Sequence, residues 1–258
     1  MNQQWMIQEL FQLANSMRPK LQPIHDTLTR HTLSVDCMDL QKVYDTFRHQ
    51  MEFFFITDID QGKVQIDTLI QSNTGTVDEH DATIDAHRLC GHTHPNVRNR
   101  KRSPPSSFDV HAMVVALQDK FVTKQKDILH FSHLVCAPEG LYVFTIHPIW
   151  LFQTRGFVDY TLHETYQNLD ALTGGKPHLH PHMDLESFLQ LSESLGVHVQ
   201  YHPKPTCHTQ IDIYTSSIQT IIARPYARIQ LIPLVKKNEN KTTPTNMTSG
   251  GVARKLQF

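Results

Sequence analysis

The chain lacks any long apolar segment, and this absence argues against a transmembrane helix. A transmembrane helix needs about 20 consecutive apolar residues, whereas the longest apolar stretches here, such as residues 53–56, have the length of a strand. The N-terminal residues show neither a basic start nor the apolar core of a signal peptide. We therefore expect an intracellular protein, cytoplasmic or nuclear, with no membrane partner.

Cysteine is scarce, and its spacing argues against a disulfide framework. The chain has 4 cysteines, at Cys37, Cys90, Cys136 and Cys207, and they are widely scattered. Secreted disulfide-rich domains carry dense cysteines, whereas scattered ones are typical of reduced intracellular thiols. Cysteine usage therefore supports the expected intracellular compartment.

Neither sign of charge is in excess. The 24 Lys and Arg residues nearly balance the 25 Asp and Glu residues, which gives a formal net charge of -1 and argues against a generally basic nucleic-acid binder. A hydrophobic content of 39% and a charged content of 19% are typical of a soluble globular protein. A length of 258 residues suffices for one large domain, or for a medium domain with extensions.

Hydrophobic periodicity predicts a mixture of helices and strands. Helical spacing is present at about residues 2–16, 39–50, 110–121 and 185–195, and residues 158–170 can also form a helix. Strand patterns cover residues 53–57, 64–70, 86–91, 131–137, 141–146, 197–201, 211–214 and 229–234, and the turn-forming residues 58–62 and 138–140 predict hairpins between the first pair and between 131–137 and 141–146. Asp36 or Asp39 can cap the helix at 39–50, and Gly196 is the predicted stop of the helix at 185–195. This order predicts an α/β (α+β) fold with a largely antiparallel or mixed sheet.

Two histidines that are one residue apart stand out in residues 90–95, which read Cys-Gly-His-Thr-His-Pro. On an extended backbone, His92 and His94 point to the same side, as two ligands of one metal ion must. Asp109 can supply a third ligand and leave a fourth position open for water, which is typical of a catalytic zinc site. His-x-His-Pro alone is a modest signal in a chain with 18 histidines.

Ser106 and Asp109 have two compatible interpretations. A serine followed three residues later by an acidic residue is typical of a helix capping box, in which both side chains satisfy backbone amides. The same arrangement would hold the Asp109 carboxylate rigidly, as a metal ligand requires.

Glu52 lies where the predicted helix 39–50 gives way to the strand 53–57. A charged residue there is ordinarily a solvated helix end. A metal-dependent hydrolase, however, needs a base that takes a proton from water and passes it to the leaving group. Glu52 is the candidate for that role.

These motifs together resemble the JAMM (MPN+, or JAB) metalloprotease family. That family carries a glutamate near the start of an apolar strand, then His-Ser/Thr-His-Pro, then Pro-Ser-x-x-Asp, and the same order is found here in Glu52, residues 92–95 and residues 105–109. The flanking segments 88–91 and 133–144 also resemble the family, so that the likeness covers residues 36–150.

The resemblance implies a fold, a cofactor and a set of roles. It implies a curved, mixed sheet flanked by helices, Zn²⁺ bound by His92, His94 and Asp109, Glu52 as general base, and Ser106 as a donor to the tetrahedral oxyanion. The reaction would be hydrolysis of a peptide or isopeptide bond. The implied partner is a protein substrate, such as a conjugate of ubiquitin or of a ubiquitin-like protein.

The same reasoning divides the chain into four segments. Residues 36–157 are the predicted JAMM/MPN-like catalytic domain, preceded by an N-terminal helical extension over residues 1–35. Residues 158–235 form a predicted C-terminal α+β extension. Residues 236–258 are polar, and we expect a disordered tail there.

The chain departs from the family pattern at two places. The interval from His94 to Asp109 is longer than usual, and the added residues carry four basic side chains, which are Arg98, Arg100, Lys101 and Arg102. They form either a solvated loop or a clamp for an acidic substrate surface. In addition, Glu52 is followed by Phe-Phe-Phe-Ile, where relatives usually have glycines.

Other readings remain open at this stage. A catalytically inert MPN-like scaffold is one alternative, and a RadC-like protein associated with nucleic acid is another. A second histidine cluster, over residues 178–184, lies in a predicted loop where Asp184 also serves as a helix cap. We interpret that cluster and the Cys207-His208 pair as parts of loops, and the glycine pair at residues 250 and 251 lies in the expected tail.

Overall fold

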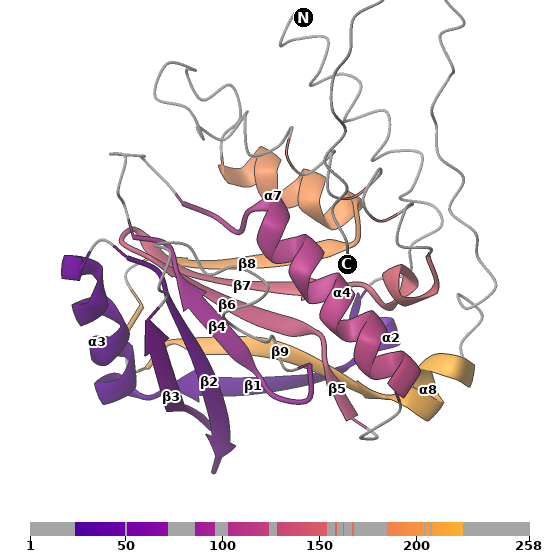
Figure 1. Cartoon of the computed structure of the whole chain (residues 1–258), viewed down its shortest axis with the longest axis horizontal. Helices are drawn as coiled ribbons and strands as arrows, with labels where there is room; N and C mark the ends of the chain where they lie inside the picture. Colours follow the sequence, from indigo (N-terminus) through magenta and orange to yellow (C-terminus); the bar gives the residue numbers. More distant parts are fainter. Residues whose placement is uncertain are drawn as a thin grey trace, which may run out of the picture.

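A nine-stranded mixed β-sheet organises the computed structural model of the chain (Figure 1). The structure describes residues 24–49, 51–71, 86–95, 103–123, 128–153, 185–203, 205–206 and 208–223, together with residues 158, 162 and 167. The strands are β1 (Thr29–Val35), β2 (Phe53–Asp60), β3 (Lys63–Gln71), β4 (Cys90–Thr93), β5 (Ile128–His130), β6 (Ser132–Ala137), β7 (Gly140–Ile146), β8 (Val197–Pro203) and β9 (Gln210–Ser217). Their order across the sheet is β5-β9-β1-β3-β2-β4-β6-β7-β8.

The sheet is curled, so that strands far apart in this order approach each other. The side-chain amide of Gln200 on β8 donates to the backbone oxygen of Asp212 on β9 at 2.8 Å and accepts from the Asp212 backbone N–H at 3.1 Å. These two hydrogen bonds link β8 to β9, although the two strands are not neighbours in the sheet. The expected mixed α+β architecture is therefore confirmed.

Both faces of the sheet are buried, which explains the uninterrupted apolar runs of β6 and β7. Alternate residues of a strand point to opposite faces. On β6, Val135 belongs to one buried cluster and Leu134 to another. On β7, Phe144 and Val143 divide in the same way. The sheet is therefore a middle layer with helices on each side.

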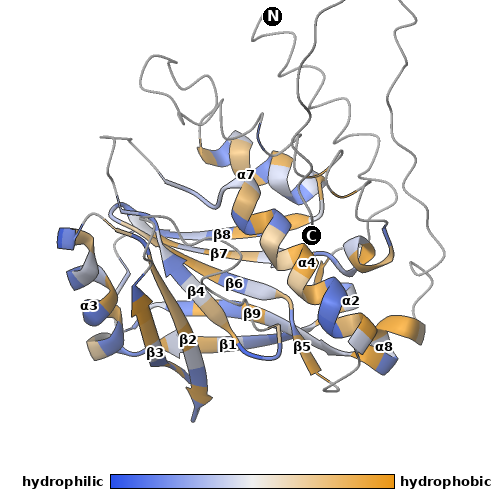
Figure 2. Cartoon of the chain, in the orientation of Figure 1, coloured by the Kyte–Doolittle hydropathy of each residue, from blue (hydrophilic) through white to orange (hydrophobic). Residues whose placement is uncertain are grey.

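The helices cover these two faces (Figure 1). They are α2 (Ile24–Thr27), α3 (Cys37–Thr46), α4 (Ser107–Thr123), α7 (Leu185–Ser194) and α8 (Ile218–Ala223), with short 3₁₀ helices at Phe47–His49 and Pro148–Phe152. Helix α4 packs through the predicted stripe of Val110, Val114 and Leu117, all buried in the larger cluster. Hydrophobic and hydrophilic residues alternate along this helix (Figure 2).

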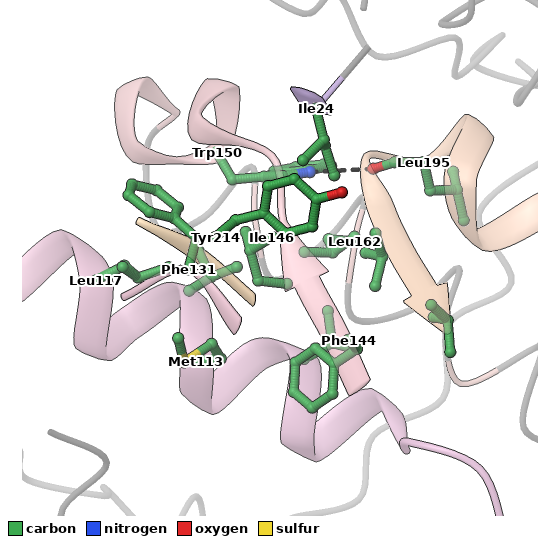
Figure 3. Packing of buried hydrophobic residues seen from close by; sticks show 14 of the residues in the cluster. Ile24, Met113, Leu117, Phe131, Phe144, Ile146, Trp150, Leu162, Leu195 and Tyr214 are labelled. Atoms are coloured by element: carbon green, nitrogen blue, oxygen red, sulfur yellow. Dashed lines mark hydrogen bonds between the residues drawn. The ribbon is translucent and has the colours of Figure 1, made fainter. Parts of the chain in front are cut away.

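The larger cluster joins the C-terminal part of the described chain to the centre. Trp150 is fully buried, and its indole Nε1 donates to the backbone oxygen of Leu195 at 3.0 Å (Figure 3). This bond satisfies the one polar atom of the largest buried side chain. Leu195 follows α7, and Gly196 closes that helix with a φ of 77°, as the predicted glycine stop requires.

Several local predictions are confirmed. Asp36 caps α3, because its carboxylate accepts from the backbone N–H groups of Met38 and Asp39. The predicted hairpins are present as β2–β3 and β6–β7, with antiparallel pairing over nearly their whole lengths. The turn between β2 and β3 holds Gln61 and Gly62 at positive φ, which suits the predicted turn cluster.

Strand β1 differs from the helical extension expected over residues 1–35. Within that segment, Ile24–Thr27 is one helical turn, but Thr29–Val35 is a strand that pairs antiparallel with β9 over six residue pairs. Its β-branched residues suit a strand, and the stabilising partner lies far along the chain. Strands β1, β8 and β9 thus share one sheet with the strands of residues 36–157.

The strand that delivers the histidines is shifted from the predicted residues 86–91 to Cys90–Thr93. Residues 86–88 form a turn, where Arg88 makes ion pairs with Asp58 and with Asp67. The bounds of β4 are set by its neighbours, since it pairs antiparallel with β2 and parallel with β6. His92 therefore lies inside the strand.

Other predictions fall outside the described residues, or mostly so. These are the helix at 2–16, the loop at 72–84, the strand at 229–234 and the tail at 236–258, and of residues 158–170 the structure describes only 158, 162 and 167. In the described part of the chain, no helix is long and apolar enough to cross a membrane.

Gly91 allows a close approach between β4 and the aromatic ring of its neighbour. It is paired with Phe55 on β2 and with Leu134 on β6. A Cβ atom at this position would overlap the Phe55 ring and lie 2.7 Å from Cβ of Leu134. The residue that precedes His92 must therefore be glycine for packing reasons.

We expect Gly91→Ala to lower the free energy of unfolding by about 1–3 kcal/mol, the usual cost of overpacking a core. Urea denaturation with a metal chelator present measures this change. The double variant Gly91→Ala, Phe55→Leu is the control, because removal of the ring makes room and the two effects should then be less than additive. A single variant within about 0.5 kcal/mol of the unsubstituted chain, the range typical of neutral surface changes, would show that the contact is not tight.

Candidate metal centre

His92 and His94 project from β4 and its immediate continuation. The backbone stays paired beyond the strand, since the N–H of His94 donates to the carbonyl oxygen of Cys136 at 2.8 Å. The two Nε2 atoms lie 2.9 Å apart. The expected placement of both imidazoles on one side of the strand is therefore confirmed.

Asp109 reaches the histidines from the first turn of α4. Its Oδ1 lies 3.0 Å from Nε2 of His92, and its Oδ2 lies 3.3 Å from Nε2 of His94. The Ser106 backbone N–H donates to Oδ2 at 2.5 Å, and the Asp109 N–H donates to Oγ of Ser106 at 3.3 Å. The capping box and the carboxylate site are thus the same structure, as the compatible interpretation predicted.

These three residues form a group that can hold a metal ion. Their ligand atoms all lie within 4.8 Å of one another, and His92 is only 4% exposed. Two imidazole nitrogens and one carboxylate oxygen suit Zn²⁺, and three protein ligands leave a coordination position for water. The donor set therefore fits the metal that the sequence led us to expect.

The charges around the site favour the protonated form of His94. Burial lowers the pKa of His94, but the Asp109 carboxylate, the Glu52 charge and the hydrogen bond to Ser103 outweigh burial and raise this pKa to about 9. Burial raises the pKa of Asp109, yet His92 and His94 hold it well below its usual range. In the metal-free protein a proton on His94 thus takes the place of a cation beside an ionised Asp109.

Each histidine has a partner behind it that sequence reasoning missed. Nδ1 of His92 lies 2.9 Å from Nε2 of His133 on β6, and Nδ1 of His94 donates to the carbonyl oxygen of Ser103 at 3.1 Å. The Ser103 N–H in turn donates to the carboxylate of Glu139. In the sequence, His133 is marked only by its place at the start of an apolar strand. Its contact with His92 follows from the register between β4 and β6.

Glu52 lies beside the group. It directly precedes β2, in which Phe54 is paired with His92, and continuation of this antiparallel register by two residues sets Glu52 opposite His94. The Phe53 N–H donates to Oγ1 of Thr93 at 2.9 Å, which fixes the backbone next to Glu52. The charge of Glu52 contributes to the raised pKa of His94, so the two side chains are electrostatic neighbours.

The remaining predicted site residues lie outside the described part of the chain. They are the basic residues Arg98, Arg100, Lys101 and Arg102, the histidine cluster at residues 178–184, and Cys207. Their predicted roles stay predictions. The structure thus brings together the predicted ligands, Ser106 and Glu52, which came from three separate motifs.

Comparisons of the chain with family models, with curated proteins and with solved structures found no match. The kind of site must therefore be inferred from its own residues alone. It is a buried candidate centre for one metal ion, with two histidines, one aspartate and a neighbouring glutamate.

We expect the unsubstituted chain to bind one equivalent of Zn²⁺, and His92→Ala and Asp109→Ala to weaken binding strongly. Loss of a ligand should cost more than the roughly 10–100-fold that loss of a supporting hydrogen bond costs. Elemental analysis and chelator competition measure this. His198→Ala is the matched control, because His198 also pairs with a carboxylate, that of Glu193, but on the surface. Equal binding by His92→Ala and His198→Ala would contradict the assignment.

Zn²⁺ affinity should rise with pH up to about 9. The pKa of His94 is raised above its ordinary value to about 9, so at neutral pH its proton must leave before Nε2 can bind a cation. Displacement of one proton gives a rise of about tenfold per pH unit below the pKa. Chelator competition between pH 6.5 and 8.5 tests this expectation, and a flat profile would contradict it.

Proposed function

We propose that the chain is a zinc-dependent hydrolase of the JAMM type that cleaves a peptide or isopeptide bond. One observation carries this proposal: His92 and His94 from a strand and Asp109 from a capped helix converge within 4.8 Å, with Glu52 as their electrostatic neighbour. The sequence pattern requires these four residues to meet, although they come from segments separated by many residues.

The arrangement of elements supports the proposal as well. The glutamate precedes β2, the histidines lie on β4 and its immediate continuation, and the aspartate is in the first turn of the helix that packs on the same sheet. This is the order that the resemblance implies for a mixed, curved sheet flanked by helices. An MPN/JAB-like fold is accordingly part of the proposal.

The residues that would hold the ion are His92, His94 and Asp109, since their donor atoms already face one another. A bound divalent ion would supply Lewis-acid chemistry, which lowers the pKa of water and polarises a carbonyl group. The capping box contributes rigidity, because both Asp109 and Ser106 are held by reciprocal hydrogen bonds at the end of a 17-residue helix.

Glu52 is assigned the proton transfers. In hydrolysis of an amide, water forms a bond to the carbonyl carbon, the C–N bond breaks, and one proton moves from water to the leaving nitrogen. The Glu52 carboxylate accepts this proton and then donates it to the amine. Its place beside His94 supports this role, because both transfers must occur next to the ligand group.

Ser106 is assigned to the oxyanion. Its hydroxyl oxygen accepts from the Asp109 N–H, and the hydroxyl hydrogen is then the donor that can meet the developing negative charge. A donor at the mouth of a helix also benefits from the positive end of the helix dipole.

A protein is the proposed substrate. The exposed Phe108, adjacent to Asp109 on the first turn of α4, offers an apolar contact surface beside the ligands with 65% of its area accessible. Conjugates of ubiquitin or of a ubiquitin-like protein are the first substrates to try, because the family resemblance points to them. The inert scaffold and the nucleic-acid-associated protein are alternatives that the experiment below distinguishes.

Glu52→Gln should keep the metal and lose cleavage. Removal of a general acid–base typically costs about 10²–10⁴-fold in rate, whereas an amide at this position leaves all three ligands in place. Zinc content and cleavage of a panel of ubiquitin and ubiquitin-like conjugates, with and without chelator, measure both effects. Glu193→Gln, at a surface carboxylate that pairs with His198, is the control and should cleave normally.

Three results would go against the proposal. Cleavage by Glu52→Gln at the normal rate would remove Glu52 from the mechanism. A zinc-loaded chain that cleaves no member of the panel would favour the scaffold. Salt-sensitive binding of nucleic acid without cleavage would favour the nucleic-acid-associated protein.

A further inference from the structure

His133 stands behind the metal centre, and the roles proposed above do not use it. The side chain is 1% exposed. Its Nε2 lies 2.9 Å from Nδ1 of His92, and its Nδ1 is buried with no hydrogen-bond partner among the described residues. A histidine with one committed nitrogen and one unpartnered nitrogen in the core needs a physical explanation.

The ring of His133 is held firmly in place. His133 is paired with Cys90 on β4 and with Phe144 on β7, and it therefore lies in an interior strand. Its ring centroid lies 5.1 Å from that of His92 and 5.3 Å from that of Phe144. Nε2 of His133 is thus aimed at His92 by packing on both sides.

We infer that His133 is a positioning residue, which holds His92 in the tautomer that binds a metal ion. This inference rests on the metal site of the proposed function. The atom of His92 that faces Asp109 and His94 is Nε2. A nitrogen that binds a cation must offer its lone pair, so the proton of a neutral His92 must sit on Nδ1.

Nδ1–H of His92 then donates to Nε2 of His133, which is the acceptor in this bond. Because Nε2 of a neutral His133 is unprotonated in that state, its own proton sits on Nδ1, the buried atom for which the described residues offer no hydrogen-bond partner. Binding by His92 therefore fixes the tautomers of both rings.

A bound cation would select one direction of this hydrogen bond, because Nε2 of His92 can face the cation only without its proton. The hydrogen bond to His133 then determines which nitrogen of His92 carries the proton.

Two substitutions separate this role from simple packing. His133→Phe keeps a ring and removes the acceptor, and we expect Zn²⁺ affinity to fall by about 10–100-fold. In His133→Gln the amide oxygen can replace the Nε2 acceptor, and affinity should recover to within about threefold of the unsubstituted chain. Phe144→Leu is the control, since it changes packing against His133 without removing the acceptor.

Stability of the metal-free protein gives an independent readout. His133→Phe leaves the buried Nδ1 of His92 without its acceptor, and Phe144→Leu loosens the packing against His133. Both variants should therefore lower the midpoint of urea unfolding, but only His133→Phe should lower affinity. A purely structural role predicts instead that affinity falls in Phe144→Leu as well.

The tautomers can be read directly by two-bond ¹H–¹⁵N spectra of the histidine side chains with and without Zn²⁺. We expect Nδ1 of His92 and Nδ1 of His133 to be protonated in the loaded chain. A loaded chain in which Nδ1 of His92 carries no proton, or equal affinity in His133→Phe and the unsubstituted chain, overturns the inference. Zinc binding without cleavage overturns only the proposed hydrolase, whereas a chain that binds no metal overturns both.

Discussion

Strand β4 is the constraint on which the site depends. It has only four residues, yet it is paired with β2 on one side and with β6 on the other. These two ladders fix which residues share a face: Phe54 falls beside His92, and His133 falls behind it. Gly91 makes the arrangement possible on the opposite face, where the Phe55 ring occupies the space of a side chain.

The second constraint is the first turn of α4. Asp109 satisfies a backbone amide of the helix start and also faces two imidazole nitrogens. A carboxylate in this position cannot rotate toward solvent without the loss of the cap, worth about 1 kcal/mol in a typical helix. Helix stability and ligand placement therefore depend on the same side chain, as do the raised pKa of His94 and the lowered pKa of Asp109.

The features that can be predicted from the sequence are those that depend on neighbouring residues. The Asp36 cap, the β2–β3 hairpin, the Ser106–Asp109 box and the same-sided histidines all follow from residues close together in the chain, and the structure has each of them. The misses share a different cause. The pairing of β1 with β9 and the contact of His133 with His92 are set by register between distant strands, which side-chain periodicity does not encode.

The pairing of β1 with β9 also concerns the order of events during synthesis. His31 and Thr215 bond side chain to side chain at 2.9 Å across a separation of 184 positions. At about 5–20 residues per second, β1 leaves the ribosome roughly 10–40 s before its partner exists. During that interval its apolar residues Leu33 and Val35 have no β9 to cover them, so the pairing of β1 in this sheet waits on a strand made much later.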